Sequence, residues 1–300
     1  MNIKPWIQAA RLRTLPLSVS GIIVGSAYAH HQGFSDWRIV VLALLTTLGL
    51  QVLSNYANDY GDGVKGTDTN RIGEKRLVAA GLITANQMKK AVTITSVFTF
   101  IIALFLIYVA FGKENFTLSL IFILLGIASI GAAIKYTVGK GAYGYSGFGD
   151  VFVFIFFGWV SVIGSNFLFT HFIDWKLFLP ASSIGLLSVA VLNLNNMRDI
   201  ENDKIAKKNT LVVKMGLNWA KKYHEVCISI ASIMFLVFCV VVKITAIPVL
   251  IINIPLLIHI GKIKKSEKYE DFEPELKKVA LSTFALSILF WLFLCIIPDF

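Results

Sequence analysis

Charged residues are scarce in this sequence. Asp, Glu, Lys and Arg make up 15% of its 300 residues, whereas soluble proteins contain about 25% of them. Hydrophobic residues reach 56%, the mean hydropathy is +0.72, and the apolar residues stand in uncharged blocks. Several blocks run for about 18 residues or more, long enough to cross roughly 30 Å of hydrocarbon. Because these blocks are apolar on all sides, a soluble protein built from amphipathic helices is excluded.

Cysteine and histidine are also rare. The three cysteines, Cys227, Cys239 and Cys295, lie far apart inside apolar runs, which favours small buried side chains over a disulfide framework or a metal site. The five histidines lack the spacing of metal ligands. The first 14 residues carry three bases and no small-residue cleavage pattern follows them, so we expect no cleaved signal peptide.

The apolar blocks predict an all-α, multi-pass integral membrane bundle of about nine transmembrane helices, in a single domain over residues 1–300. The expected spans lie at about 15–33, 38–57, 91–111, 116–134, 151–170, 177–194, 224–242, 244–261 and 279–297. Of the 28 Lys and Arg residues, 24 fall at the N-terminus or in the loops after spans 2, 4, 6 and 8. By the positive-inside rule, the N-terminus is expected in the cytoplasm. The net charge of +10 is therefore a topology signal, and no nucleic-acid partner is expected.

Two clusters of Asp and Asn follow the second and sixth expected spans. The first consists of Asn55, Asn58, Asp59 and Asp62, and the second of Asn195, Asp199 and Asp203. Residues at i, i+4 and i+7 or i+8 share one face of a helix, so each cluster points two carboxylates and an amide in one direction. An Asp at the centre of a membrane helix costs roughly 2.5–3.5 kcal/mol, and a divalent cation would relieve that cost. Oxygen ligands without Cys or His favour Mg²⁺ or Ca²⁺.

Basic residues accompany both clusters. They are Lys65, Arg71, Lys75 and Arg76 after the first cluster, and Arg198, Lys204, Lys207 and Lys208 within or after the second. Arg suits bidentate contacts with phosphate, Lys neutralises it as a point charge, and Mg²⁺ usually binds through a few carboxylates plus phosphate oxygens. The two clusters together therefore predict one Mg²⁺–diphosphate site. Helix caps, juxtamembrane charges, a cation transporter and a lipid-binding scaffold without catalysis are the alternatives.

The last polar loop, from Lys262 to Lys278, mixes six bases with five acids. It carries no Asn/Asp array like those after spans 2 and 6. We interpret it as a solvated connector.

Four stretches of this chain resemble the UbiA superfamily of intramembrane aromatic prenyltransferases, and within it the 1,4-dihydroxy-2-naphthoate polyprenyltransferase branch of menaquinone synthesis. They are residues 11–16, 51–68, 136–150 and 195–211. Gly66 stands where the ubiquinone-type enzymes of the family carry a third Asp, which agrees with the naphthoate branch and counts against a hydroxybenzoate acceptor. Lys207 stands where that branch usually has Gly, a departure that affects the local turn and leaves the acidic ligands intact.

The resemblance implies Mg²⁺-dependent transfer of a polyprenyl group from polyprenyl diphosphate to 1,4-dihydroxy-2-naphthoate. The carboxyl group is lost, the product is demethylmenaquinone, and the setting is the lipid of the bacterial inner membrane. Another aromatic acceptor, such as homogentisate, a different quinone precursor or a porphyrin, is the alternative within the family.

The resemblance also assigns roles to particular residues. The expected metal ligands are Asn55, Asn58, Asp59, Asp62, Asn195, Asp199 and Asp203, and the expected catalytic residues are Asp59, Asp62, Asp199, Asp203, Lys135 and Tyr136. The expected substrate-binding residues are Arg11, Lys65, Asp68, Arg71, Arg76, Asp150, Arg198 and Lys208. A Lys-Tyr pair such as Lys135–Tyr136 is equally typical of a membrane-interface anchor, and Asp68 and Asp150 either orient the acceptor or cap helices. Phe152, Phe154, Phe156 and Phe157 are candidates to line a tunnel for the isoprenoid tail.

Overall fold

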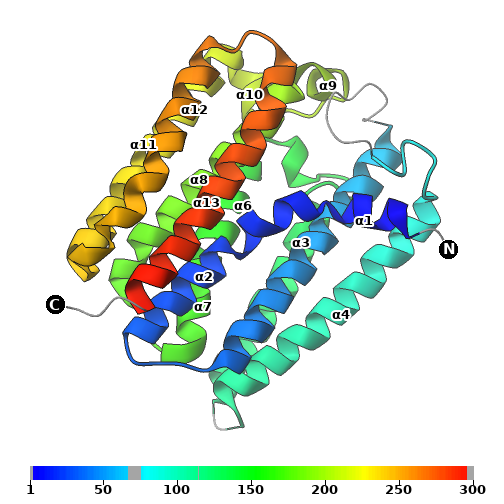
Figure 1. Cartoon of the computed structure of the whole chain (residues 1–300). Coiled ribbons are helices and arrows are strands. Elements are labelled where there is room, and N and C mark those ends of the chain that lie inside the picture. The colour runs from blue at the N-terminus through cyan, green and yellow to red at the C-terminus, as the bar shows by residue number, and fades with distance from the viewer. Residues whose placement is uncertain (1–2, 67–75, 114, 296–300) are drawn as a thin grey trace.

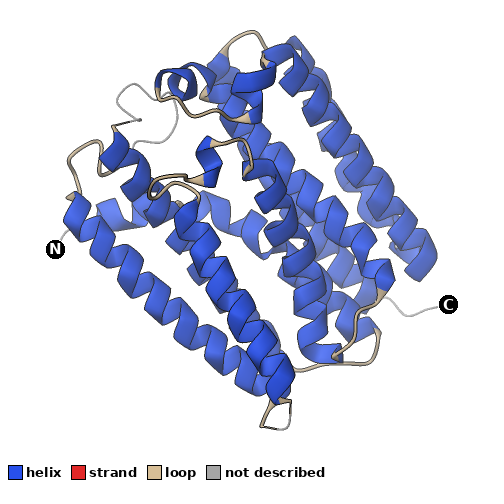
Figure 2. Cartoon of the chain, turned by 180° about the vertical axis from the view of Figure 1, so that it is seen from behind, coloured by secondary structure: helices blue, strands red, loops and turns tan. Residues whose placement is uncertain are grey.

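The computed structural model describes residues 3–66, 76–113 and 115–295, and over these ranges it contains helices and no strand (Figure 2). The α-helices are α1 (Lys4–Ala10), α2 (Leu15–His31), α3 (Trp37–Lys65), α4 (Ala85–Phe111), α5 (Phe116–Lys135), α6 (Gly149–Val153), α7 (Ser161–Thr170), α8 (Phe178–Arg198), α9 (Ile200–Ile205), α10 (Leu211–Met215), α11 (Leu217–Val242), α12 (Asn253–Lys265) and α13 (Phe272–Cys295). Shorter helical turns are η1 (Leu12–Thr14), η2 (Tyr143–Tyr145), the π-helical η3 (Phe154–Val160), η4 (Trp175–Leu177), η5 (Ile244–Ile252) and η6 (Tyr269–Asp271). The predicted all-α class is confirmed.

Eight helical segments in the described part of the chain are long and apolar enough to cross a membrane. They are 37–65, 85–111, 116–135, 149–170, 175–198, 217–242, 246–265 and 269–294. The remaining expected span corresponds to α2, which has 17 residues and, at about 1.5 Å per residue, reaches about 25 Å, the lower limit for crossing the hydrocarbon. The multi-pass membrane architecture is confirmed.

Three helices begin earlier than the apolar blocks do. α4, α11 and α13 start at residues 85, 217 and 272, six or seven residues before the expected 91, 224 and 279. Each added segment is polar, and a span predicted from hydropathy begins only after the last charged residue, so the prediction misses these first turns. At α4 a capping box fixes the start, because Thr84 Oγ1 accepts from the Gln87 amide at 3.2 Å while Gln87 Oε1 accepts from the Thr84 amide at 3.0 Å.

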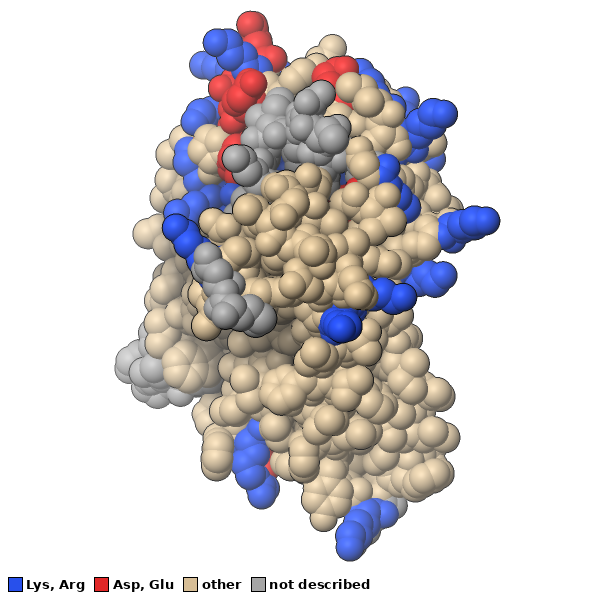
Figure 3. Space-filling view, turned by 90° about the vertical axis from the view of Figure 1, so that its right-hand side faces the viewer, with Lys and Arg blue, Asp and Glu red and all other residues tan. Residues whose placement is uncertain are grey.

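The helices pack so that both Asp/Asn clusters lie at the same end of the bundle. α2 and α13 run side by side, α8 packs against α11 and α13, and α3 packs against α4 (Figure 1). The C-terminal ends of α3 and α8 point toward the end that carries α9 and α10, and the short α1 lies across the long helices (Figure 1). Charged side chains gather on that end of the visible face, above a broad, nearly uncharged surface (Figure 3). The side of the membrane on which this end lies stays a prediction.

Candidate active site

A cavity of about 380 Å³ opens between α2, α3, α5, η3 and α8. Its polar end is lined by Arg11, Asn55, Asn58, Arg76, Asn195 and Lys208, and its other end by Ile22, Ala43, Leu106, Ile107, Phe122 and Leu168. Cations and amides thus occupy one end and hydrocarbon the other. Such a cavity suits an amphipathic ligand with an anionic head and an apolar tail.

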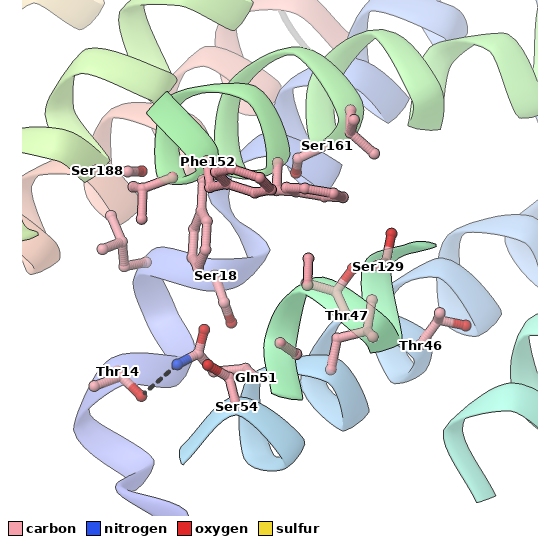
Figure 4. Close-up of a pocket in the computed structure, with 18 of the residues that line it drawn as sticks. Thr14, Ser18, Thr46, Thr47, Gln51, Ser54, Ser129, Phe152, Ser161 and Ser188 are labelled. Carbon is pink, nitrogen blue, oxygen red and sulfur yellow. Dashed lines mark hydrogen bonds between the residues drawn. The ribbon is translucent and has the colours of Figure 1, made fainter. Parts of the chain in front are cut away.

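The middle of the cavity carries many hydroxyl groups that are already satisfied within their own helices. Ser18, Thr46, Ser129 and Ser188, labelled in Figure 4, each donate to a carbonyl three or four residues earlier, at 2.8 Å. Because these hydroxyls bond to their own backbone, they present a wall that does not require a polar ligand.

Three of the four candidate tunnel phenylalanines face this space. Phe152, Phe156 and Phe157 line the cavity, whereas Phe154 packs edge-on against Trp159. The wall beside Phe152 is completed by Tyr143, whose ring stacks on it with 3.9 Å between centroids. Burial, and secondarily the neighbouring Tyr136, raises the pKa of Tyr143, so its hydroxyl stays protonated and donates to the Ala132 carbonyl at 2.9 Å.

Asp62 is the carboxylate of the first cluster that joins the basic side chains. It is 2% exposed, its Oδ2 accepts from Arg76 Nη2 at 2.8 Å, and its Oδ1 accepts from the Tyr145 hydroxyl at 2.8 Å. Arg76 also lines the cavity, so the pair stands at the polar end.

Asp59 points elsewhere. It is fully buried, and its two carboxylate oxygens accept from the backbone amides of Leu77 and Val78 at 2.9 and 2.8 Å. Helical spacing places Asp59 on the same face of α3 as Asn55 and Asp62, but the Asp59 carboxylate binds these two amides and does not line the cavity. In this arrangement Asp59 anchors the chain at residues 77–78.

Asn55 and Asn58 lie between the N-terminal segment and the loop after α5. Asn55 Nδ2 donates to the Ala10 carbonyl at 2.8 Å and to Thr14 Oγ1 at 3.1 Å, while Asn58 Oδ1 accepts from Thr137 Oγ1 at 3.1 Å. The corner that Asn55 holds contains Arg11 in the left-handed conformation, with φ +50°. This conformation costs about 1–2 kcal/mol in a residue with a Cβ, and here it accompanies a side chain that enters the cavity.

The second cluster is organised around Arg198, whose side chain is 1% exposed. Its Nε and Nη2 donate to the two oxygens of Asp199 at 2.7 Å each, and Nη2 also donates to Asn195 Oδ1 at 2.7 Å. Its Nη1 pairs with Glu273 at the start of α13. Arg198 therefore binds the acidic cluster in this structure and does not line the cavity itself.

A strained turn follows Asp203. Lys208 Nζ lies 3.6 Å from Asp203 Oδ1, and the Lys208 amide donates to the Asp203 carbonyl at 2.8 Å. Between them Lys207 is left-handed, with φ +54°. Lys207 therefore adopts a conformation that favours Gly, at a conformational cost.

Tyr145 connects the two clusters and was not identified from the sequence. Besides its bond to Asp62, its ring lies 3.8 Å from Lys65 Nζ and 5.7 Å from Lys208 Nζ. Its carbonyl accepts from the Asn209 amide at 3.0 Å. Tyr145 belongs to one of the four resembling stretches, but that signal alone gives it no role.

The remaining expected residues separate into three groups. Tyr136 lines the cavity. Lys135 is exposed, Lys65 lies beside Tyr145 outside the cavity, and Asp150 is buried but does not line the cavity. Asp68 and Arg71, with Lys75, lie outside the described residues.

The donors near the polar end fit Mg²⁺. They are amide and carboxylate oxygens, from Asn58, Asp62, Asn195, Asp199 and Asp203, and oxygen donors are what this hard cation prefers. Within the described ranges, no three His, Cys, Asp or Glu side chains form a prebuilt cage. That also suits Mg²⁺, which typically takes one or two carboxylates and completes its shell with water and phosphate oxygens.

Comparison with known proteins identifies the family. The sequence model of the UbiA prenyltransferase family matches residues 18–289. The chain belongs to the UbiA prenyltransferase family. Two curated relatives of this UbiA member are both named 1,4-dihydroxy-2-naphthoate octaprenyltransferase. The one from Haemophilus influenzae is 43% identical over 98% of this chain and 97% of its own. The one from Escherichia coli K12 is 47% identical over 77% of this chain and 74% of its own.

Solved structures of UbiA homologues share the fold. The homologue from Archaeoglobus fulgidus bound to GPP and Mg²⁺ has a TM-score of 0.67 at 14% identity, over 95% of this chain and 99% of that one. The apo homologue from Aeropyrum pernix has a TM-score of 0.68 at 13% identity, over 93% and 96%. This UbiA member therefore has the family's helical fold. The Archaeoglobus fulgidus neighbour binds GPP together with Mg²⁺.

Proposed function

We propose that this chain transfers a polyprenyl group from a polyprenyl diphosphate to 1,4-dihydroxy-2-naphthoate, with loss of the carboxyl group, to give the hydroquinone form of demethylmenaquinone. The single observation that carries the proposal is the cavity, cationic at the Asp/Asn end and apolar at the other. The relative at 43% identity over nearly the whole chain supports the choice of acceptor. We place the reaction in the bacterial inner membrane, with the N-terminus and both Asp/Asn clusters on the cytoplasmic side.

The diphosphate head would lie at the polar end of the cavity. Arg11, Arg76 and Lys208 line this end and would offset the negative charge that grows on the diphosphate as it departs. Asn58, Asp62, Asn195, Asp199 and Asp203 are the residues that would hold Mg²⁺. When bound, Mg²⁺ supplies Lewis-acid stabilisation of the phosphate oxygens.

The isoprenoid tail would extend between the apolar walls. As the allylic carbon–oxygen bond breaks, its electron pair leaves with the diphosphate, and the electron-rich ring attacks the cation-like carbon. The ring loses its carboxyl group as CO₂. Phe152, Phe156 and Phe157 would keep water away from this carbon, and their ring faces attract positive charge.

The test uses the purified full-length protein in lipid nanodiscs with Mg²⁺, a polyprenyl diphosphate and 1,4-dihydroxy-2-naphthoate, with mass spectrometry of the product. We expect a prenylated, decarboxylated naphthalenediol that disappears with EDTA and returns with excess Mg²⁺. Prenylation of another phenol but not of this naphthoate would overturn the acceptor. Absence of prenylation with any acceptor, together with ion flux in sealed vesicles, would overturn the enzyme in favour of a cation transporter.

A further inference from the structure

Glu273 lies in the segment that the sequence predicts to be a solvated connector, but its carboxylate is part of an ion-pair chain. It bridges Arg13 of η1 and Arg198 of α8. Glu273 is 31% exposed as a side chain, whereas Arg198 is 1% exposed. An acid in the first turn of a helix is ordinarily explained by the helix dipole. That explanation does not account for a carboxylate that reaches a buried arginine 75 residues away.

The four charged side chains of this ion-pair network compensate one another. Arg13 and Arg198 are positive, Asp199 and Glu273 are negative, and Arg198 touches both acids. A buried guanidinium requires paired carboxylates because an uncompensated charge is costly away from water. Glu273 therefore shares with Asp199 the task of neutralising Arg198. Without Glu273, the positive charge of Arg198 would fall on Asp199 alone.

We propose that Glu273 is a positioning residue for the second Asp/Asn cluster and acts through Arg198. It holds the guanidinium that in turn orients Asn195 and Asp199, and it keeps Asp199 available to a cation by taking part of the charge of Arg198. Through Arg13 it also ties η1, next to the Arg11 corner, to α13. The inference rests on the proposed function, because it concerns the oxygen donors that would hold Mg²⁺.

The charge balance gives a signature that a merely structural contact would not give. Removal of the Glu273 charge makes the cluster one unit more positive, which disfavours a cation and does not disfavour an anion. We expect Glu273→Gln to weaken cation binding by about tenfold, as loss of a residue that orients metal ligands typically does, while the KM of the diphosphate at saturating Mg²⁺ stays equal or falls. Removal of the Arg13 charge shifts the balance the other way, so Arg13→Gln should leave cation binding equal or tighter.

The experiment measures Mn²⁺ binding by EPR in the presence of inorganic diphosphate, on full-length protein in nanodiscs, and separately the Mg²⁺ concentration for half-maximal prenyl transfer. The control is Glu270→Gln, an exposed acid of the same loop, which should change neither. Tighter or unchanged Mn²⁺ binding in Glu273→Gln, or a parallel rise in the diphosphate KM, would overturn the proposal. If Glu273→Gln fails to fold, weaker Mn²⁺ binding in Arg13→Gln would overturn it as well. The EPR readout needs no acceptor, so its outcome stays separate from a failure of naphthoate prenylation.

Discussion

The phenolic hydroxyl of Tyr145 donates a 2.8 Å hydrogen bond to Asp62 Oδ1, across 83 positions of the chain. This bond fixes one oxygen of Asp62 while Arg76 holds the other. Lys65 lies over the same ring, and the Tyr145 carbonyl accepts from the Asn209 amide in the segment after the second cluster, so Tyr145 joins the first cluster to that segment.

Tyr145→Phe should therefore impair prenyl transfer without unfolding the protein. The ring and its contact with Lys65 remain, but a hydrogen bond to a carboxylate is lost, typically worth about 1.5–3 kcal/mol, or roughly a 10–100-fold loss in kcat/KM if it is fully expressed. Steady-state kinetics check this, with Tyr108→Phe, an exposed tyrosine of α4, as the control. Wild-type kinetics in Tyr145→Phe would remove Tyr145 from the site.

Asp59 and Asp62 should give different phenotypes when each is changed to Asn. Asp59→Asn leaves a single oxygen for two buried amides and should cost about 1–3 kcal/mol of stability, seen as a lower melting temperature in detergent. Asp62→Asn should instead raise the Mg²⁺ concentration for half-maximal rate with a smaller change in melting temperature. If Asp59→Asn raised the Mg²⁺ concentration for half-maximal rate as much as Asp62→Asn does, Asp59 would also be a ligand.

Removal of the metal should abolish turnover reversibly. EDTA-treated protein is expected to regain activity with Mg²⁺ or Mn²⁺ and not with Zn²⁺, because the donor set contains no Cys or His. The rate measured against free metal concentration checks this. Full activity after exhaustive chelation would contradict the assignment of the acidic clusters.

Gly126 offers a test of the tail position. It lines the cavity, and a Cβ built there meets nothing within 4 Å, so a larger side chain would enter the cavity. Gly126→Leu should raise the KM of long polyprenyl diphosphates more than that of geranyl diphosphate. Gly131→Leu on the same helix is the matched control, because its Cβ is equally unobstructed but Gly131 does not line the cavity. An equal effect on long and short donors would place the tail elsewhere.

Lys207→Gly should stabilise the protein. Lys207 has φ +54°, a conformation that costs about 1–2 kcal/mol in residues with a Cβ and little in Gly. Thermal unfolding checks this, and Lys207→Ala, which keeps the Cβ, should show no such gain. A melting temperature of Lys207→Gly below that of Lys207→Ala would contradict a conformational strain at this position, and a loss of stability in both variants relative to the wild type would show that the Lys side chain itself stabilises the turn.

The sequence by itself determined the membrane spans, the class of helical bundle and the oxygen-rich chemistry of the site. These properties are local: an uncharged block must lie in hydrocarbon or be buried, and Asp and Asn favour a hard cation in any arrangement. The four resembling stretches, read in order, also indicated the family.

Only the tertiary structure decided which side chains meet. Helical spacing groups Asp59 with Asp62, yet Asp59 bonds to residues 77–78 because that segment folds back against its face of α3. Tyr145 and Glu273 gain their roles from partners 83 and 75 positions away. The residues next to Glu273 in the sequence do not indicate whether its side chain faces water or a buried arginine. The difference is decided by how α8 and α13 pack, because side-chain contacts depend on the neighbouring helix and not on chain neighbours.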